Sequence, residues 1–522
     1  MQVKSCYDRE RKEVGLLGKS KTPSFVCEIP LRVTRKQEKI LNARFEASRQ
    51  FYNAMLGEGL RRLNLMRESK AYQVARAIPK DEKHKKERQA AFMGLRNEFG
   101  FTEYHLSSYG TQVRRSWIGE HIGINLAQKL VKRAFEAAEK IAYGKAKKVR
   151  FKTKGRGLRS IEEATNKTGM MWKDTHVTWN GLILLMVKGA ENDPVIAHGL
   201  SSKVKYVRLV RRNIRGKERY YAQLVCEGVP YQKLDRIIGN EDIGTDLGPS
   251  TVAIVGDTKA SLRLLAEGTA RNHRKIRRLQ RKQDRQRRAN NPDCYDEKGR
   301  AIKGKHPTKK SRRQLATEAV LRDGYRREAA HRKIEHGQLA NEILAIGKYI
   351  HTEKLSFKAF QKLFGRSISV RAPKMFLSML QRKAESAGGS FEEINTRTTA
   401  LSQTCLCGRK HKKKLSERVH ECECGVVIQR DLFSAYLSKY VKKDRLHVAD
   451  ANMHWQGLKP VLKTAWETAH NELASRGLVP SSFGNPWSQS ESSEKEHLPR
   501  HETQDDVEGE KSLTRACESA AV

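Results

Sequence analysis

The sequence lacks any long hydrophobic run, and its longest uninterrupted apolar stretch is residues 182–187. A helix that spans a bilayer needs about 20 mainly apolar residues, so the sequence predicts no transmembrane segment. Residues 1–20 carry charges throughout and have no apolar segment of the kind found in secretory signal peptides. These two absences predict a protein that stays in the cytoplasm.

Acidic residues are scarce relative to basic ones, because 59 Asp and Glu stand against 103 Lys and Arg, for a net charge of +44. A chain this basic repels itself unless a polyanion neutralises it, and nucleic acid is the usual partner. A membrane-surface binder is the alternative, but such proteins concentrate their charge in one short segment, whereas here it is spread along the chain. The 522 residues are also too many for one hydrophobic core, so several domains are expected.

Cysteine is infrequent too, and four of the nine cysteines fall within twenty residues of one another. This distribution excludes a disulfide framework and predicts a reducing compartment with one metal site. Cys405, Cys407, Cys422 and Cys424 form two pairs, each followed by glycine, which is typical of a closed, structural Zn²⁺ site. One residue separates the members of each pair instead of the usual two, which leaves two alternatives open. Either His411 or His420 replaces a thiolate ligand, or the thiols are free.

The first half of the chain combines strands with a helical segment. Residues 21–34 are typical of a strand, and residues 36–150 carry apolar side chains at helical spacing. Residues 173–228 contain two expected hairpins, one turning at Asn180-Gly181 and the other near Arg215-Gly216. The first strand has no other nearby partner, so we expect a small β-barrel interrupted by a helical domain.

The second half contains an unusually basic helix. Ten of the eighteen residues from 271 to 288 are Lys or Arg, and their mutual repulsion would destabilise an isolated helix. A solvated helix face is the alternative, but charge of one sign covers nearly every face and favours a nucleic-acid contact. Residues 289–313 are polar and predict a mobile loop, and the acidic, serine-rich residues 481–522 predict disorder. The expected nucleic-acid contacts are Arg271, Arg274, Arg277, Arg278, Arg281 and Arg285.

Three carboxylates stand at the ends of strands or the start of a helix. Asp246 lies near the end of an apolar strand, Glu353 lies on a second one, and Asp431 begins an apolar helix. If they converge, they could hold two Mg²⁺ ions about 3.5–4 Å apart for attack on a phosphodiester. The order strand-Asp, strand-Glu, helix-Asp indicates an RNase H-like nuclease core. Asp431 could instead simply cap its helix, and acids that compete with Asp246 are Glu241, Asp242 and Asp257.

Three segments of the sequence resemble the RuvC motifs and zinc insert of TnpB and of miniature type V CRISPR effectors. They are GTDLGPSTVAIVGD, HTEKLSF and SQTCLCG…HECECGVVIQRDLFSAYL. The resemblance is specific over residues 237–445 and looser over residues 20–230. The CxC spacing departs from the family pattern and leaves the identity of the zinc ligands open.

The resemblance implies an RNA-guided DNA endonuclease in the cytoplasm of a prokaryotic cell. Its partners would be a guide RNA and double-stranded target DNA beside a short flanking motif, with one or two protein copies on each guide. It further implies that Asp246, Glu353 and Asp431 bind Mg²⁺ and that the four clustered cysteines bind Zn²⁺. A guided DNA binder that no longer cuts, and an RNase H-like transposase or resolvase without RNA, are the alternatives.

The expected fold is a multidomain α+β chain with five parts. They are a wedge-type β-barrel (1–35 and 151–235), a helical recognition lobe (36–150), a RuvC nuclease domain that includes the Arg-rich helix 271–288 (236–400 and 426–480), a zinc-binding insert (401–425), and a disordered acidic tail (481–522).

Overall fold

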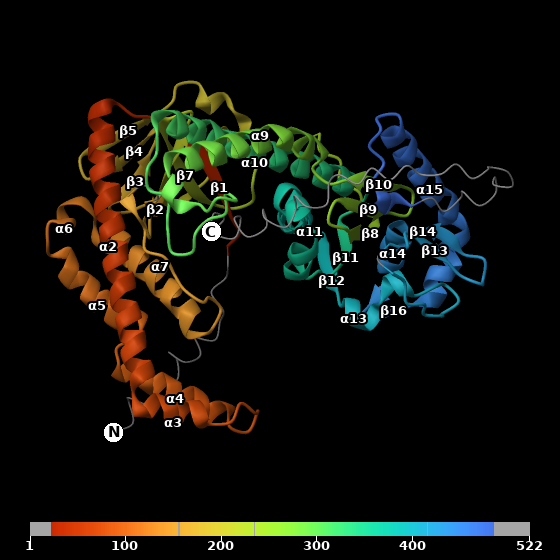
Figure 1. The fold of residues 1–522 in the computed structure, drawn as a ribbon, viewed down its shortest axis with the longest axis horizontal. Coiled ribbons are helices and arrows are strands. Elements are labelled where there is room, and N and C mark those ends of the chain that lie inside the picture. The colour runs from red at the N-terminus through yellow and green to blue at the C-terminus, as the bar shows by residue number, and fades with distance from the viewer. Residues whose placement is uncertain (1–21, 155–156, 234, 415, 485–522) are drawn as a thin grey trace. The chain divides into compact units, whose positions relative to one another are not determined.

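A computed structural model describes residues 22–154, 157–233, 235–414 and 416–484 of the chain (Figure 1). The described residues form two compact units, one within Met1–Arg236 and Arg274–Ala329 and the other within Ile237–His273 and Ala330–Val522. The first unit has one large hydrophobic core, and the second has two smaller cores. Most of the predicted acidic tail lies outside the described residues, so its disorder stays a prediction.

The first unit begins with a strand and a set of helices around the long helix α2 (Arg35–Glu68). Thr34 starts α2 with a capping box, in which its side chain and that of Gln37 each accept a backbone N–H from the other residue. Helix α7 (Ile124–Ala142) packs along α2, and a Cβ at Gly59 would lie 3.5 Å from the Cβ of Ala138, an ordinary van der Waals distance. The other helices of this segment are α3 (Lys70–Ala77), α4 (Lys85–Glu98), α5 (Glu103–Arg114), α6 (Ile118–His121) and α7 (Ile124–Ala142).

A seven-stranded antiparallel sheet forms the rest of this core, in the order β2-β6-β7-β1-β5-β4-β3. The N-terminal strand β1 pairs with β7 and β5, which confirms that it joins the later strands. A short helix, α8 (Pro194–Leu200), follows β5. The strands are β1 (Ser24–Arg32), β2 (Ser160–Glu162), β3 (Met170–Lys173), β4 (His176–Trp179), β5 (Leu182–Met186), β6 (Val204–Ile214) and β7 (Lys217–Glu227).

Both predicted hairpins are present, and the expected barrel is not. Asn180 and Gly181 have φ of 43° and 74° between β4 and β5, and Arg215 and Gly216 have φ of 51° and 80° between β6 and β7. Two successive positive φ values suit the two-residue turns of hairpins, and this is why Asn-Gly was a reliable signal. Within the described residues β2 and β3 are edge strands, so the sheet is open. The prediction of a closed barrel was wrong because alternation within strands does not encode closure.

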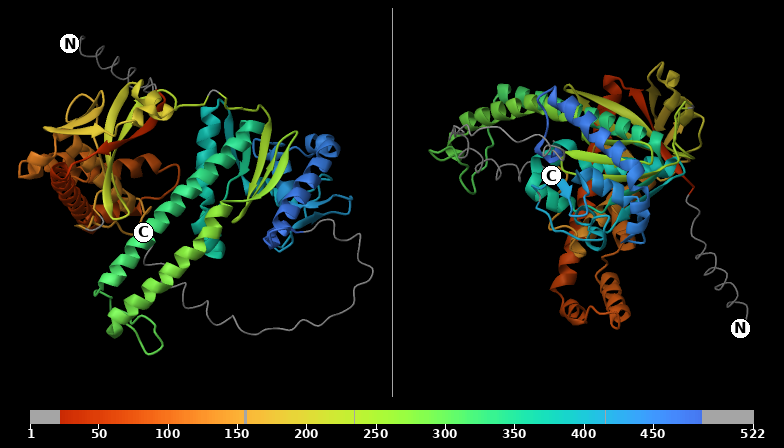
Figure 2. Two further views of the ribbon diagram at one scale, coloured as in Figure 1. Left: turned by 90° about the horizontal axis from the view of Figure 1, so that it is seen from above. Right: turned by 90° about the vertical axis from the view of Figure 1, so that its right-hand side faces the viewer.

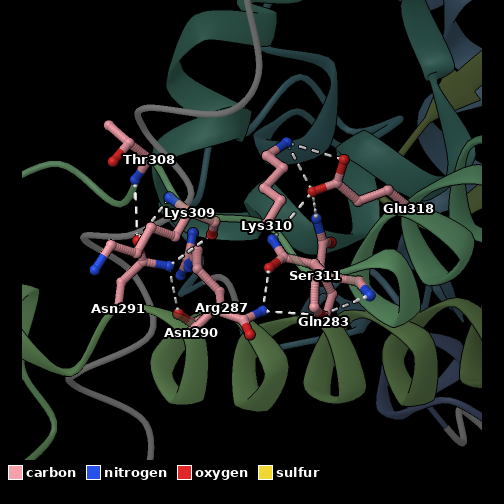
Figure 3. A network of polar contacts seen from close by, with 10 residues as sticks. Gln283, Arg287, Asn290, Asn291, Thr308, Lys309, Lys310, Ser311 and Glu318 are labelled. Carbon is pink, nitrogen blue, oxygen red and sulfur yellow. Dashed lines mark hydrogen bonds and ion pairs between the residues drawn. The ribbon is translucent and has the colours of Figure 1, made fainter.

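Two long helices, α9 (Glu267–Asn290) and α10 (Arg312–Ile346), form a hairpin. Within the first unit they lie side by side (Figure 2), where Gln280 donates a hydrogen bond to the Tyr325 hydroxyl. The connecting residues were expected to be mobile, yet they are tied to both helices by a polar network around Asn291 (Figure 3). The Asn291 side chain accepts from the backbone N–H groups of Thr308 and Lys309 at 3.1 and 2.9 Å.

The second unit contains a five-stranded mixed sheet in the order β10-β9-β8-β11-β12. Strand β9 is antiparallel to both β8 and β10, while β11 runs parallel to both β8 and β12. Since β8 and β11 are parallel, their carboxyl ends meet at one edge of the sheet. The strands are β8 (Asp242–Leu247), β9 (Thr251–Val255), β10 (Ala260–Leu264), β11 (Tyr349–Glu353) and β12 (Ser390–Ile394).

Helices and two small ribbons surround this sheet. The ribbon β13–β14 carries the second pair of clustered cysteines between its strands, and α14 follows it directly. The helices are α11 (Phe357–Arg371), α12 (Pro373–Ser386), α13 (Thr396–Thr399), α14 (Arg430–Ser438) and α15 (Val448–Ala474). The ribbons pair β13 (Val419–Glu421) with β14 (Val427–Gln429) and β15 (Val441–Lys442) with β16 (Arg445–Leu446).

No helix among the described residues is long and apolar enough to cross a bilayer.

Candidate functional site

Asp246 and Glu353 come from neighbouring parallel strands of the second unit. Thr245 of β8 lies opposite Thr352 of β11, and the two acids are the next residues along each strand. Side chains alternate between the faces of a sheet, so equivalent positions on paired strands point to the same face. Both acids are half-buried there.

Asp431 reaches the same place from α14, which packs on β8. Glycine makes this approach possible, because a Cβ at Gly244 would lie 1.8 Å from the carbonyl oxygen of Ala435. Asp431 lies in the first turn of α14 and is buried, with 8% of its surface exposed. The helix N-terminus favours negative charge at this position.

Asp431 is not the cap of its helix. The cap is Gln429, whose side-chain Oε1 accepts a hydrogen bond from the backbone N–H of Leu432 at 2.7 Å. The carboxylate of Asp431 therefore stays available for the cluster, and the alternative role suggested by its position in the sequence does not apply.

The three carboxylates are close enough to perturb one another. Burial, followed by the negative charges of Asp431 and Glu353, raises the pKa of Asp246 well above its ordinary value. Burial and the charge of Asp431 raise the pKa of Glu353 to about 7. Burial also raises the pKa of Asp431. Acidic groups gathered in this way favour a cation between them, and oxygen donors suit Mg²⁺.

The acids that competed with Asp246 in the sequence are engaged elsewhere. Glu241 accepts a hydrogen bond from the Thr258 hydroxyl at 2.6 Å. Asp242 lies 3.0 Å from Nε2 of His351. Asp257 forms an ion pair with Lys439.

Two arginines beside the carboxylates were missed by the sequence analysis. Nε of Arg430 lies 3.6 Å from Oδ1 of Asp431, and both side chains are largely buried. The positive charges of Arg430 and Arg418 oppose the rise in the pKa of Asp246 and of Asp431. Burial in turn lowers the pKa of Arg418, against the charges of Asp431 and Asp246. The position of Arg430 next to Asp431 was the one available signal for it, and Arg418 is brought in only by the fold.

The four predicted cysteines form a second cluster. Their sulfur atoms all lie within 4.8 Å of one another, with Cys405 3.4 Å from Cys424 and Cys407 3.6 Å from Cys422. A tetrahedral site with Zn–S bonds of about 2.3 Å has sulfur–sulfur edges of about 3.8 Å, and a disulfide would be near 2.05 Å. The geometry therefore fits four thiolates around zinc. Among the described residues, these four cysteines alone gather three or more ligand atoms this closely.

Neither candidate histidine belongs to the sulfur cluster. His420 is buried, its Nδ1 lies 2.6 Å from Nζ of Lys413, and its ring centre lies 4.4 Å from that of Phe433. His411 uses its backbone N–H to donate to the carbonyl of Gln403. His420 is thus part of the packing between the insert and α14.

The predicted nucleic-acid residues lie along α9. Four of them are exposed within the first unit, and Arg277 is half-buried. Arg271 belongs to α9, but its side chain lies outside the described part of the structure. Arg287 and Arg288, which share the helix, both pair with Asp284. The exposed members are Arg274, Arg278, Arg281 and Arg285.

Comparison with known proteins identifies the segment that contains the sulfur cluster. Residues 374–437 match the family model described as Cas12f1-like, TNB domain. This segment includes all four cysteines, Arg418, Arg430 and Asp431. The match confirms the resemblance to TnpB and to miniature type V effectors of the Cas12f kind.

The similarity of this chain to solved structures is low. One, described as the Cas12f1-sgRNA-target DNA complex, is 13% identical, covers 80% of this chain and 98% of its own, and has a TM-score of 0.41. Another, described as a CRISPR-Cas12f ternary complex, is 13% identical, covers 77% and 85%, and has a TM-score of 0.26. Both scores are below 0.5, so no assignment of a residue depends on them. No curated protein matches the chain.

Proposed function

We propose that this chain, which carries the TNB domain of the TnpB and Cas12f-like miniature type V effectors, is an RNA-guided DNA endonuclease. The observation that supports this most is the approach of Asp246, Glu353 and Asp431 to one another from three distant segments, where burial and the charge of Asp431 raise the pKa of both other acids. In this proposal they are the catalytic carboxylates that hold Mg²⁺, two ions in all. Asp246 and Glu353 meet through strand pairing, and Asp431 is placed by the packing of α14.

Magnesium held there would supply an activated water and would stabilise the charge that develops on the phosphate. The protein contributes the arrangement of the ligands and the positive charges of Arg418 and Arg430. Those charges reduce the repulsion between the carboxylates and between the acids and an approaching phosphodiester. The N-terminus of α14 adds a partial positive charge beside Asp431.

The guide RNA and the target duplex are the proposed partners. The net charge of +44 and the exposed arginines of α9 suit a protein that follows phosphate backbones. Pairing between guide and target would then read the sequence, while the protein holds the heteroduplex beside a short flanking motif. One or two copies of the chain would bind each guide. Zinc at the cysteines has a structural role, because four thiolates leave no open coordination position.

The test uses the full chain purified together with the RNA that accompanies it. That RNA is sequenced, and a duplex matching its guide portion is offered with randomised flanking bases, in Mg²⁺ or in EDTA. Cleavage in Mg²⁺ alone supports the proposal. Tight binding without cleavage supports a guided DNA binder, and purification without RNA together with action on branched DNA supports a transposase or resolvase.

A further inference from the structure

The Arg430 guanidinium contacts two different parts of the second unit. Its Nε faces Oδ1 of Asp431 at 3.6 Å. Its Nη1 donates to the backbone carbonyls of Glu417 and Lys414 at 2.8 and 3.3 Å. One planar group therefore joins a carboxylate of the cluster to the chain between the two cysteine pairs.

The segment that Arg430 holds is bound into the sulfur cluster at both ends. Cys407 precedes it, and β13 and then Cys422 follow it. The backbone N–H of Arg430 also donates to the carbonyl of Arg418 at 2.9 Å, next to the β13–β14 pairing. The conformation of this segment thus depends on the fold of the insert that carries the four cysteines.

We propose that Arg430 is a positioning residue that couples the four-cysteine insert to the carboxylate cluster, so that the folded insert fixes the orientation of Asp431. This inference rests on the proposed function of the carboxylates. The insert would then have two effects on the nuclease site, one through packing at His420 and Phe433 and the other through the Arg430 side chain.

The shape of the arginine side chain matters as much as its charge. A guanidinium presents donors in a rigid fork, so it can hold two carbonyls with one edge and face a carboxylate with the other. Lysine keeps the positive charge but is a point donor on a flexible stem, and it cannot make all these contacts in the same geometry. Arg430→Lys therefore separates positioning from charge compensation.

The experiment measures Mn²⁺ binding to the RNA-free full-length chain by electron paramagnetic resonance. The relevant signal is the part of the binding that Asp246→Ala removes. Four proteins are compared: wild type, Arg430→Lys, Cys422→Ser and the double variant. Arg476→Lys is the matched control, because Arg476 also pairs with acids of the same unit, Glu267 and Glu472. Zinc content by elemental analysis and circular dichroism show whether each variant is folded.

Arg430→Lys is expected to keep its zinc and to weaken the Mn²⁺ binding by about tenfold, within the range known for residues that orient metal ligands. Arg476→Lys should leave the binding unchanged. Cys422→Ser should also weaken it, and the double variant should be little weaker than the worse single variant, since both changes break the same connection.

Wild-type Mn²⁺ affinity in zinc-loaded Arg430→Lys would overturn the proposal, and so would fully additive effects of the two substitutions. Failure of the proposed function gives a different result, because the wild type itself would then show no Mn²⁺ binding that depends on Asp246.

Discussion

Thr245 lies opposite Thr352 in the parallel pairing of β8 with β11, and this register brings Asp246 next to Glu353. A shift of one residue would send one of the two acids to the opposite face of the sheet. The buried threonines and the close packing of α14 over Gly244 fix the register. The carboxylate cluster is thus a consequence of strand pairing, and its properties can be tested residue by residue.

Asp246→Ala and Asp431→Ala should each reduce cleavage of a matched duplex by at least about 10³-fold, an estimate from the loss of a catalytic metal ligand. Binding of the guide RNA and of the target should change little, since neither acid offers a positive charge to a phosphate. The measurements are single-turnover cleavage and filter binding. Asp242→Asn is the matched control, because Asp242 is an exposed acid on the same strand. An equal loss of binding in the two alanine variants would show that these acids serve the fold.

Cys422→Ser should lower the zinc content and unfold the insert at a lower temperature than in the wild type. Zinc binding contributes about 10 kcal/mol or more to the folding of small zinc peptides, so its loss is a large effect. Elemental analysis and thermal unfolding give the result. Cys294→Ser is the control, since Cys294 is a free cysteine outside the cluster. Full stability of a zinc-free chain would contradict the structural role of the metal.

The first unit should lose stability as the pH rises, because the buried Glu163 becomes ionised. Its side chain is buried, Oε1 accepts from the Met170 N–H at 3.3 Å, and burial raises the pKa of Glu163 to about 7. A raised pKa in the folded state gives a stabilising contribution that is complete below about pH 4.5 and is lost as the pH rises through about 7.

Glu163→Gln should therefore stabilise the first unit by roughly 1–3 kcal/mol at pH 8 and by little at pH 4.5. Chemical denaturation at the two pH values measures this, with Glu191→Gln as an exposed control. Equal effects of Glu163→Gln at both values would mean that Glu163 does not titrate in this interval.

Asn291→Ala should loosen the connection between α9 and α10. The buried side chain accepts from two backbone N–H groups and donates to the carbonyls of Arg287 and Lys309, both at 2.9 Å. Leaving such groups unsatisfied costs about 1–3 kcal/mol. Hydrogen exchange of the Thr308 and Lys309 amides should accelerate, whereas Glu297→Ala, an exposed change in the same loop, should have no effect. Unchanged exchange in the Asn291 variant would mean that the loop is held by other contacts.

Combined replacement of Arg278, Arg281 and Arg285 by alanine should weaken binding of the copurifying RNA. If each contacts a phosphate, the slope of log affinity against log salt should become shallower by about 2, the value for three lost contacts to a single strand. Titrations between low and high salt give this slope. Arg287→Ala is the control, because its charge is paired with Asp284. An unchanged slope would mean that these exposed arginines face solvent and do not contact the RNA.

Features that depend on a few neighbouring residues could be predicted from the sequence. The Asn180-Gly181 and Arg215-Gly216 turns need positive φ, which glycine adopts readily, so the glycine in each pair indicates a turn. Cys405, Cys407, Cys422 and Cys424 lie so close in sequence that little chain has to fold before they meet. The helix that begins at Arg430 carries its apolar pattern within one short segment.

Other features depended on segments that are far apart in the chain. The open edges at β2 and β3, the exclusion of His420 from the sulfur cluster and the presence of Arg418 beside the acids were not encoded in any short window. Each depends on which surface packs against which, and many arrangements share the same local pattern.

The sequence by itself determined the positive charge, the two hairpin turns, the four clustered thiols and the three acids that could form one metal site. Only the tertiary structure decided that Asp246, Glu353 and Asp431 meet, that Gln429 caps α14 in place of Asp431, and that Arg430 joins the acids to the insert. The physical reason is that strand register and helix packing are set by the burial of side chains from distant segments, and these contacts form only when the whole unit folds.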